Sequence, residues 1–312
     1  MRVGEGGHQF DWHEHWAMIP DSLTGRANGR THGVEVTAGG EIVVFSQATP
    51  AVLFFDREGT LRRSWGDRFP GAHGLTLVVE NGVEYLWLTD HDTGEVVKTT
   101  LDGRTVLNIV RPGHRVYESA RYAPTWVAVC EERFGGSGDV WVTDGYGSGY
   151  IHRYDKGGRY LGSLNGEEGS SGAFKCPHAI FLDTRHREPE IYIADRGNHR
   201  IQVYDLEGAF KRQAAAEHLT SPCAFDRRGE FLLVPELFAR VTILDLDDRP
   251  VCRLGANEPV VETEGWPDLK PPQVRPGKFN SPHDAVFDHE GNIFVAEWII
   301  GGRITKLGKR ED

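Results

Sequence analysis

The sequence predicts an all-β fold, a six-bladed β-propeller, because one strand-rich unit recurs along the chain. Six copies are present in the 312 residues, and each contains an apolar strand, a glycine turn, a second apolar strand with a polar end, and a third strand ending near Asp and Gly. Apolar residues within a unit alternate or form short β-branched runs, without a sustained helical period. A repeat of roughly 40–60 residues is typical of four-stranded propeller blades.

The units follow one another without an intervening domain. Their first strands begin HGVEVT, HGLTLV, PTWVAV, PHAIFL, SPCAFD and SPHDAV, at residues 32, 73, 124, 177, 221 and 281. We expect residues 1–312 to form a single six-bladed domain, with the proline-rich stretch 256–278 as a loop between the last two blades. The sixth unit has room for only three strands. A segment from Trp12 to Ile19 is therefore expected to supply the outer strand and close the ring, which removes an open edge.

Composition excludes several classes of protein. The net charge of −11 disfavours nucleic acid as a partner, because neutralising phosphates requires a basic face. No run approaches the roughly 18 apolar residues of a membrane helix, and the N-terminus lacks the apolar core of a signal peptide. We therefore expect a cytoplasmic protein that is not bound to membranes. Its four cysteines, none in a CxxC pair, are then expected to be reduced thiols.

Three histidines occupy equivalent positions in alternate blades. His73, His178 and His283 open the first strands of the second, fourth and sixth units, and 105 residues separate each from the next. Alternate blades of a six-fold ring lie about 120° apart and first strands are innermost, so the three imidazoles would converge on the axis. Three protein ligands with an open position is the pattern of a catalytic zinc site. The alternative is that each imidazole only bonds a neighbouring carbonyl.

Two further residues share this register. His32 stands there in the first blade and could be a fourth ligand, a proton shuttle or a channel residue. A fourth imidazole would favour iron, manganese or another divalent ion over zinc. Cys223 takes the position in the fifth blade, either as a ligand or as a small buried side chain.

A second group of side chains follows the second strand of each unit. Its members, aligned to within one residue, are Gln47, His91, Tyr146, Arg196, Glu236 and Trp298. Such a mixture of charged, polar and aromatic groups is typical of a small-molecule pocket. Within it, His91 and Glu236 could form a general acid/base pair.

Two family resemblances are carried by short motifs. FKCPHAIFLD, ADRGNHRIQVYDLEG and GKFNSPHDAVFDHEGNIFVAEW resemble NHL repeats, over most of the chain. AHGLTL, TDGYGSGY, CPHAIF, ADRGNHRIQ and SPHDAV resemble the catalytic core of peptidyl-α-hydroxyglycine α-amidating lyase. That lyase is a six-bladed propeller with a zinc ion and a structural calcium, and it cleaves a carbinolamide into an amide and glyoxylate.

The lyase resemblance implies a role for individual residues. The three axial histidines match its metal ligands. Tyr146 matches the base that acts on the substrate hydroxyl, and Arg196 matches its catalytic arginine, whose guanidinium can anchor a carboxylate or carbonyl oxygen. The alternatives are a channel-lining aromatic for Tyr146 and a packing ion pair with Asp195 or Asp144 for Arg196.

The same resemblance implies a calcium site and shows two departures. Asp284 matches the calcium ligand, together with the carbonyls of Val34 and Leu75, although it could instead cap a turn. Ser281 stands where the lyase has Met, and Gly147 where it has a disulfide cysteine. These departures suggest that the pocket chemistry is kept while the substrate differs.

Three functions fit these observations. The leading hypothesis is a metal-dependent lyase that acts on a small α-hydroxy, carbinolamide or hemiaminal-like substrate. The second is a metal-dependent hydrolase such as a lactonase, which would use the ion to activate water, although such propellers usually ligate through carboxylates. The third is a non-catalytic NHL propeller that serves as an interaction module.

Overall fold

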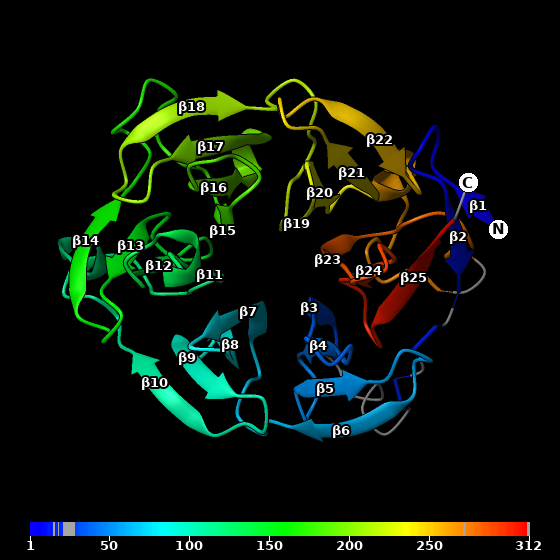
Figure 1. Ribbon diagram of the computed structural model, residues 1–312, viewed down its shortest axis with the longest axis horizontal. Coiled ribbons are helices and arrows are strands. Elements are labelled where there is room, and N and C mark those ends of the chain that lie inside the picture. The colour runs from blue at the N-terminus through cyan, green and yellow to red at the C-terminus, as the bar shows by residue number, and fades with distance from the viewer. Residues whose placement is uncertain (15, 18, 21–28, 271–272, 311–312) are drawn as a thin grey trace. The chain divides into compact units, whose positions relative to one another are not determined.

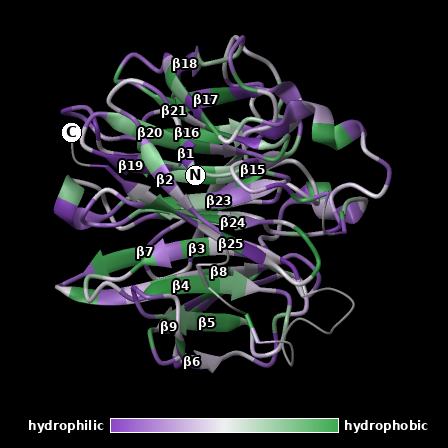
Figure 2. Ribbon diagram, turned by 90° about the vertical axis from the view of Figure 1, so that its right-hand side faces the viewer, coloured by the Kyte–Doolittle hydropathy of each residue, from purple (hydrophilic) through white to green (hydrophobic). Residues whose placement is uncertain are grey.

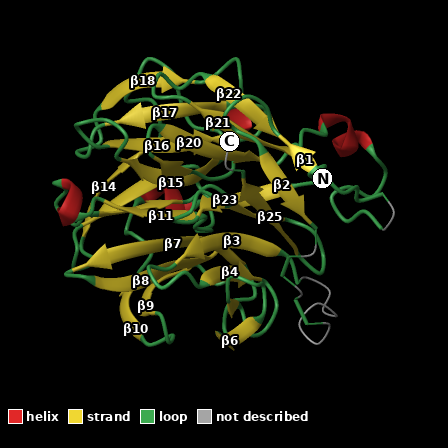
Figure 3. Ribbon diagram, turned by 45° about the vertical axis from the view of Figure 1, so that its right-hand side comes forward, coloured by secondary structure: helices red, strands yellow, loops and turns green. Residues whose placement is uncertain are grey.

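The computed structural model describes residues 1–14, 16–17, 19–20, 29–270 and 273–310, and it confirms the predicted fold class. The chain is an all-β, six-bladed β-propeller of antiparallel sheets (Figure 1). Helical structure in the described part is limited to short 3-10 turns, drawn red in Figure 3. The chain divides into two compact units, which we call unit one (Met1–Arg68 with Leu219–Asp312) and unit two (Phe69–His218).

Unit two contains the second, third and fourth blades, each a four-stranded sheet in sequential order. Their strands are β7 (Ala72–Glu80), β8 (Val83–Asp90), β9 (Glu95–Thr100) and β10 (Thr105–Ile109); β11 (Trp126–Val129), β12 (Val140–Thr143), β13 (Ile151–Tyr154) and β14 (Tyr160–Leu164); β15 (Pro177–Asp183), β16 (Glu190–Asp195), β17 (Arg200–Tyr204) and β18 (Phe210–Ala214). Within the unit, β11 lies against both β7 and β15, so the first strands of neighbouring blades face one another. Residues at the starts of these strands are thereby brought together.

Unit one contains the first, fifth and sixth blades. Their strands are β3 (Thr31–Val36), β4 (Ile42–Ser46), β5 (Val52–Phe55) and β6 (Leu61–Trp65); β19 (Asp226–Arg228), β20 (Phe231–Glu236), β21 (Arg240–Leu244) and β22 (Pro250–Leu254); β23 (Pro282–Phe287), β24 (Ile293–Glu297) and β25 (Arg303–Lys309), followed by β2 (Phe10–His13) and β1 (Arg2–Val3). Here β23 lies against β3 and β20, so the first strand of the sixth blade contacts both neighbouring blades.

The N-terminal strand completes the sixth blade, as the sequence predicts. Strand β2 pairs antiparallel with β25, with Trp12 opposite Leu307, and β1 adds a fifth strand outside it (Figure 1). The predicted bounds were wrong, because the strand is Phe10–His13 and not a segment from Trp12 to Ile19. The strand begins at Phe10 because alternate side chains of a strand face the same side, and Phe10 and Trp12 are both buried there. Trp12 packs on Phe279, with 4.7 Å between the ring centroids. Residues 15 and 18 of the expected segment lie outside the described residues.

Apolar side chains between neighbouring blades form the core. In unit two, Trp87 and Val96 of the second blade pack with Val127 and Val142 of the third. In unit one, strands of the fifth and sixth blades contribute a comparable cluster around Ile243 and Val295. Figure 2 shows hydrophobic residues, in green, concentrated on the strands. Burying one such side chain contributes about 1.5–3 kcal/mol, so the interfaces between blades hold each unit together.

In the proline-rich stretch 256–278, the described residues 256–270 and 273–278 form a loop that contains a short 3-10 turn, η4 (Glu258–Glu262). It has its own apolar cluster, in which Val260 and Leu269 pack against Ala239. Asp268 in this loop forms an ion pair with Arg30, with 2.5 Å between Oδ2 and Nη2. The loop is therefore packed onto unit one. Nowhere in the described part is a helix long and apolar enough to cross a membrane.

Candidate functional site

Each of the four aligned histidines occupies an irregularity at the start of its blade's first strand. The pairing of β15 with β16 shifts between Pro177 and Ala179, so that His178 has no opposite residue. The same shift skips His32 in β3, His283 in β23 and His73 in β7. An extra residue of this kind, a β-bulge, redirects its side chain out of the regular alternation. All four imidazoles are at most 1% exposed.

In unit two, four ring side chains gather around two of these bulges. The ring centroids of His73 and His178 are 4.7 Å apart. Tyr146, in the turn after β12, lies 4.9 Å from His73 and 5.6 Å from His178. His91, directly after β8, lies 5.7 Å from His73 and 5.4 Å from Tyr146. Four residues that the sequence singled out are therefore brought into one group.

The hydrogen bond of His73 determines which ring nitrogen carries the proton. Its Nδ1 lies 2.8 Å from the carbonyl oxygen of Thr125, the residue before β11. A carbonyl oxygen can only accept, so Nδ1 carries the hydrogen and Nε2 of the neutral ring has a lone pair. A bond of the imidazole to a neighbouring carbonyl was the alternative to metal binding. The same bond also orients Nε2 so that it can bind a metal ion.

The hydroxyl of Tyr146 lies between His178 and Arg196. It is 3.1 Å from Nε2 of His178, and both terminal nitrogens of Arg196 donate to it at 3.3 Å. Because the guanidinium supplies two donors to the phenol oxygen, the phenol hydrogen points to Nε2, which accepts it. Arg196 also donates to Sγ of Cys176 at 3.4 Å, so its position is fixed from two sides. Asp195, one of the two carboxylates that could have paired with Arg196 in the alternative interpretation, forms its ion pair with Arg200, at 2.7 Å.

Burial keeps His91 neutral. Desolvation lowers its pKa below 6.5; the nearby Asp92 and Asp90 carboxylates oppose this, and the positive charge of Arg121 adds to it. Nδ1 of His91 lies 3.1 Å from Oδ1 of Asp92. A neutral imidazole with one nitrogen facing a carboxylate can still exchange a proton, which suits a general acid/base group.

A carboxylate recurs at the end of the second strand, and its structural role was not predicted. In five blades it accepts a hydrogen bond from a backbone N–H just before the first strand of the same blade: Asp90 from Gly71, Asp144 from Ala123, Asp195 from Lys175, Glu236 from Thr220 and Glu297 from Asn280. Each bond holds the segment that leads into the inner strand. The sequence signal is the pair TD, AD, PE or AE that ends these strands.

Glu236 belongs to this carboxylate series. Its partners in unit one are Arg240, at 2.6 Å from Nε to Oε1, and the hydroxyls of Thr220 and Thr242, at 2.8 and 2.5 Å. The side chain is fully buried. These contacts indicate a structural carboxylate, and the residue in register with His91 and Arg196 is the next one, Leu237.

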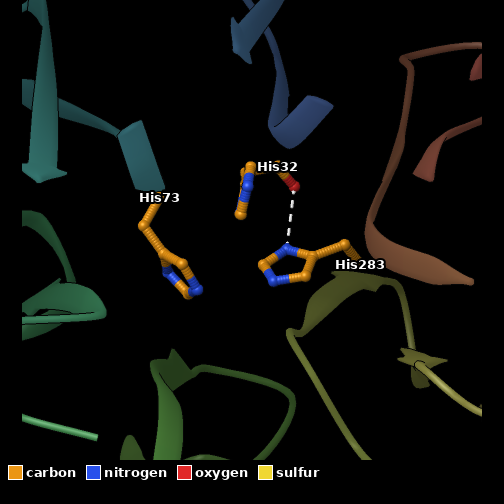
Figure 4. Close-up of side chains that lie close together, drawn as sticks. All are labelled: His32, His73 and His283. Atoms are coloured by element: carbon orange, nitrogen blue, oxygen red, sulfur yellow. Dashed lines mark hydrogen bonds between the residues drawn. The ribbon is translucent and has the colours of Figure 1, made fainter. Parts of the chain in front are cut away.

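Unit one contains a second pair of bulge histidines. The rings of His32 and His283 are 4.6 Å apart, and Nδ1 of His283 lies 3.1 Å from the His32 carbonyl oxygen, the dashed line of Figure 4. Because this oxygen can only accept, Nδ1 of His283 carries a hydrogen, and Nε2 has a lone pair when the ring is neutral. Trp298 lies 6.5 Å from His32, and the Arg30 guanidinium lies 4.9 Å from the centroid of the Trp298 ring.

Other predicted residues are placed as follows. Asp284 is buried and accepts the backbone N–H groups of Val34 and Ala285, both at 2.8 Å. Burial raises its pKa well above the ordinary value, as does, to a lesser degree, the carboxylate of Asp226. Leu75 is buried in β7 of unit two.

The cysteines and Gln47 complete the predicted set. Cys223 is fully buried, and its Sγ lies 3.6 Å from the Ser221 carbonyl oxygen. The backbone of Gln47 donates to the Arg30 carbonyl. None of the four cysteines, all within the described residues, forms a disulfide.

Sequence comparison finds relatives of two kinds. Human NHL repeat-containing protein 3 is 28% identical over 237 residues, which is 71% of this chain and 65% of the relative. A probable peptidyl-alpha-hydroxyglycine alpha-amidating lyase of Caenorhabditis elegans is 30% identical over 42% of this chain and 36% of its own. Peptidyl-alpha-hydroxyglycine alpha-amidating lyase 1 of Drosophila melanogaster is 27% identical over 77% of this chain and 45% of its own.

The chain is a homologue of both groups. It spans less than two thirds of the length of these curated relatives. No protein-family model matches it.

Solved structures agree with the fold. A streptogramin B lyase superposes with a TM-score of 0.61 at 14% identity and covers 98% of this chain, which covers all of that structure. A virginiamycin B lyase from Staphylococcus aureus gives 0.62 at 13% identity, with 96% of this chain and 99% of that one covered. At such low identity the likeness bears on the fold alone.

Proposed function

We propose that this chain is a metal-dependent lyase acting on a small α-hydroxy, carbinolamide or hemiaminal-like substrate. The observation that carries the proposal is the Tyr146 hydroxyl, which lies within hydrogen-bond reach of the Arg196 guanidinium and of Nε2 of His178. A phenol in contact with a fixed cation is suited to act as a base, because the cation stabilises the phenolate. The homology to amidating lyases supports the same reaction class.

The donor chemistry fits a divalent metal, which we propose to be zinc held by His73, His178 and His283; Nε2 of His178 would then bind the ion in place of the Tyr146 hydrogen that it accepts in this structure. A buried imidazole whose Nδ1 donates to a carbonyl offers Nε2 as a ligand when the ring is neutral, and His73 and His283 each make such a contact. His32, His73 and His283 form one group of buried histidines that could hold a metal ion, and we propose His32 as a further ligand beside the other three. When bound, a divalent ion would act as a Lewis acid toward a substrate oxygen.

The protein's own residues account for the proton movements. Tyr146, as phenolate, would take the proton of the substrate hydroxyl. Arg196 would hold the phenol oxygen and a substrate carboxylate through separate N–H groups. Formation of the carbonyl then breaks the carbon–nitrogen bond, and the proton passes to the leaving nitrogen. The products are an aldehyde and an amide, with no net gain of water.

Further parts of the proposal rest on single residues. His91 lies beside Tyr146 and would be a second acid/base group. Glu236 has a structural role, because five hydrogen bonds from Arg240, Thr220 and Thr242 occupy its oxygens. A structural calcium at Asp284, with carbonyls of Val34 and Leu75, suits the oxygen ligands that calcium prefers. We also propose a small-molecule substrate, no nucleic-acid partner, no membrane association and a cytoplasmic location.

The test combines metal content with product analysis. The purified protein should contain about one divalent ion per chain by elemental analysis, and should convert N-benzoyl-α-hydroxyglycine into benzamide and glyoxylate. His178→Ala should lose metal and activity, and Tyr146→Phe should lose activity while keeping the metal. His199→Asn is the matched control, because His199 is exposed and has a left-handed backbone that Asn tolerates.

Three outcomes would contradict the proposal. A preparation without stoichiometric metal would remove the lyase mechanism. Release of benzoate in place of benzamide would indicate hydrolysis. Full activity in Tyr146→Phe would exclude the phenol as base.

A further inference from the structure

An exposed guanidinium lies at the backbone end of Tyr146. Nε of Arg121 donates to the Tyr146 carbonyl oxygen at 3.3 Å. Among the described residues, its two terminal nitrogens have no hydrogen-bond or ion-pair partner. Because Nε is held and the residue is exposed, the guanidinium is oriented and can bind a carboxylate bidentately through its other N–H groups.

The segment that carries Arg121 is fixed to the turn that carries Tyr146. Asp144 accepts from the Ala123 backbone at 2.6 Å and from the Tyr117 hydroxyl at 2.8 Å, both before β11. It also accepts from the Ser148 backbone at 2.8 Å, within the Tyr146 turn. One buried carboxylate therefore joins the two segments, and Arg121 keeps its place relative to Tyr146.

The segment between β10 and β11, which carries Arg121, is positively charged although the whole chain is acidic. Between β10 and β11 it has three exposed arginines, Arg111, Arg115 and Arg121, against one glutamate, Glu118, while the protein carries a net charge of −11. A local excess of positive charge on an acidic protein favours an anionic ligand at that place.

Arg121 is also near His91. Its positive charge contributes to the lowered pKa of that imidazole, after the larger effect of burial. Arg196 contacts the hydroxyl end of Tyr146, and Arg121 contacts the backbone end of the same residue. A group bound by Arg121 is therefore separated from the reacting carbon by about the length of a tyrosine side chain.

We infer that Arg121 binds an anionic substituent on the leaving-group side of the substrate, remote from the carbon that becomes the aldehyde. This inference rests on the proposed lyase function and narrows its substrate class to carbinolamides whose amide part bears a carboxylate or a similar anion. Arg121 is then a specificity-determining residue that takes no part in proton transfer.

The test compares substrates that differ only in remote charge. The probes are N-(4-carboxybenzoyl)-α-hydroxyglycine and its neutral 4-carbamoyl analogue, which has nearly the same shape. Wild-type protein should prefer the carboxylate by roughly 3- to 10-fold in kcat/KM, as expected for a partly exposed charged hydrogen bond. Arg121→Ala should reduce this ratio toward one. Arg115→Ala, an exposed arginine of the same connection, should keep it, and added salt should reduce it in the wild type.

Binding of the leaving-group product separates this inference from the lyase proposal. Titration calorimetry with 4-carboxybenzamide needs no turnover, and its affinity should fall several-fold in Arg121→Ala but not in Arg115→Ala. Arg121-dependent binding without turnover of either probe would overturn the lyase function alone. Equal affinities in wild type and Arg121→Ala, or an equal kcat/KM for both probes, would overturn the role of Arg121.

Discussion

Replacing Glu236 by Gln tests whether this residue is structural or catalytic. The substitution keeps the shape of the side chain but removes its charge and turns one acceptor oxygen into a donor. In unit one that group faces Nε of Arg240 at 2.6 Å and Nη2 at 3.0 Å, with two threonine hydroxyls alongside. The new amide therefore opposes at least one donor, and Arg240 loses its buried counterion.

The loss in the free energy of unfolding depends on how deeply the ion pair is buried. Glu236 is fully buried and the Arg240 side chain is 9% exposed, so water cannot replace the lost partner. Breaking a buried ion pair from one side costs about 3–5 kcal/mol. Arg240 retains Glu258 at 3.0 Å, which places the expected loss near the lower end, about 3 kcal/mol. At a denaturant dependence of about 3 kcal/mol per M, the urea midpoint would fall by roughly 1 M.

The assay is urea unfolding followed by tryptophan fluorescence, together with metal content and turnover at low temperature. Glu258→Gln is the matched control, because its side chain is 40% exposed and its pair with Arg240 should contribute less than about 1 kcal/mol. Combining Glu236→Gln with Arg240→Met should cost less than the sum of the single changes, since no buried charge is left unpaired. Unchanged stability with a selective loss of kcat in Glu236→Gln would refute the structural assignment and restore the acid/base role.

Three further predictions concern stability and the site. Burial lowers the pKa of His152 to about 3, so between about pH 6.5 and 3 the unfolded chain binds more protons at this residue than the folded chain does. The free energy of unfolding should therefore fall as the pH drops from about 6.5 toward 3. The variant His152→Gln should show a weaker pH dependence, measured as urea midpoints across that range. Trp12→Ala should destabilise unit one by about 3–5 kcal/mol in thermal or urea unfolding, because the ring is 5% exposed and packs on Phe279. Gly74→Ala would place a Cβ 2.4 Å from the Thr125 carbonyl oxygen, which should lower the free energy of unfolding by about 1–3 kcal/mol. Because this carbonyl orients His73, the variant should also lose metal faster in dialysis against a chelator. An unchanged metal content would contradict the role of this carbonyl.

Much of the site could be anticipated from the repeat. The repeat aligns His32, His73, His178 and His283, and the structure places each at the start of a first strand. Tyr146 and Arg196 were located by the same register and a family resemblance. An alignment to within one residue cannot separate Glu236 from its neighbour Leu237, because successive side chains of a strand point to opposite faces, so the place of Glu236 in the pocket stays a prediction.

Other parts of the site had no local signal. Arg121 contacts a residue 25 positions away, beyond strands β11 and β12, and its own neighbours in sequence resemble an ordinary polar connection. The closing strand was expected in the right sheet but with wrong bounds, because the burial of Trp12 against Phe279 depends on a partner far along the chain. That residues 1–312 form one domain stays a prediction.

The fold class, the number of blades and their order follow from the amino-acid pattern, because alternation of apolar residues and regular turns are local properties that repeat. The bulges that turn the histidines, the carbonyls that orient His73 and His283, and the carboxylates that hold the inner strands arise from contacts in the folded chain. These contacts join residues of different strands and blades, and their geometry depends on distances that no period in the sequence encodes.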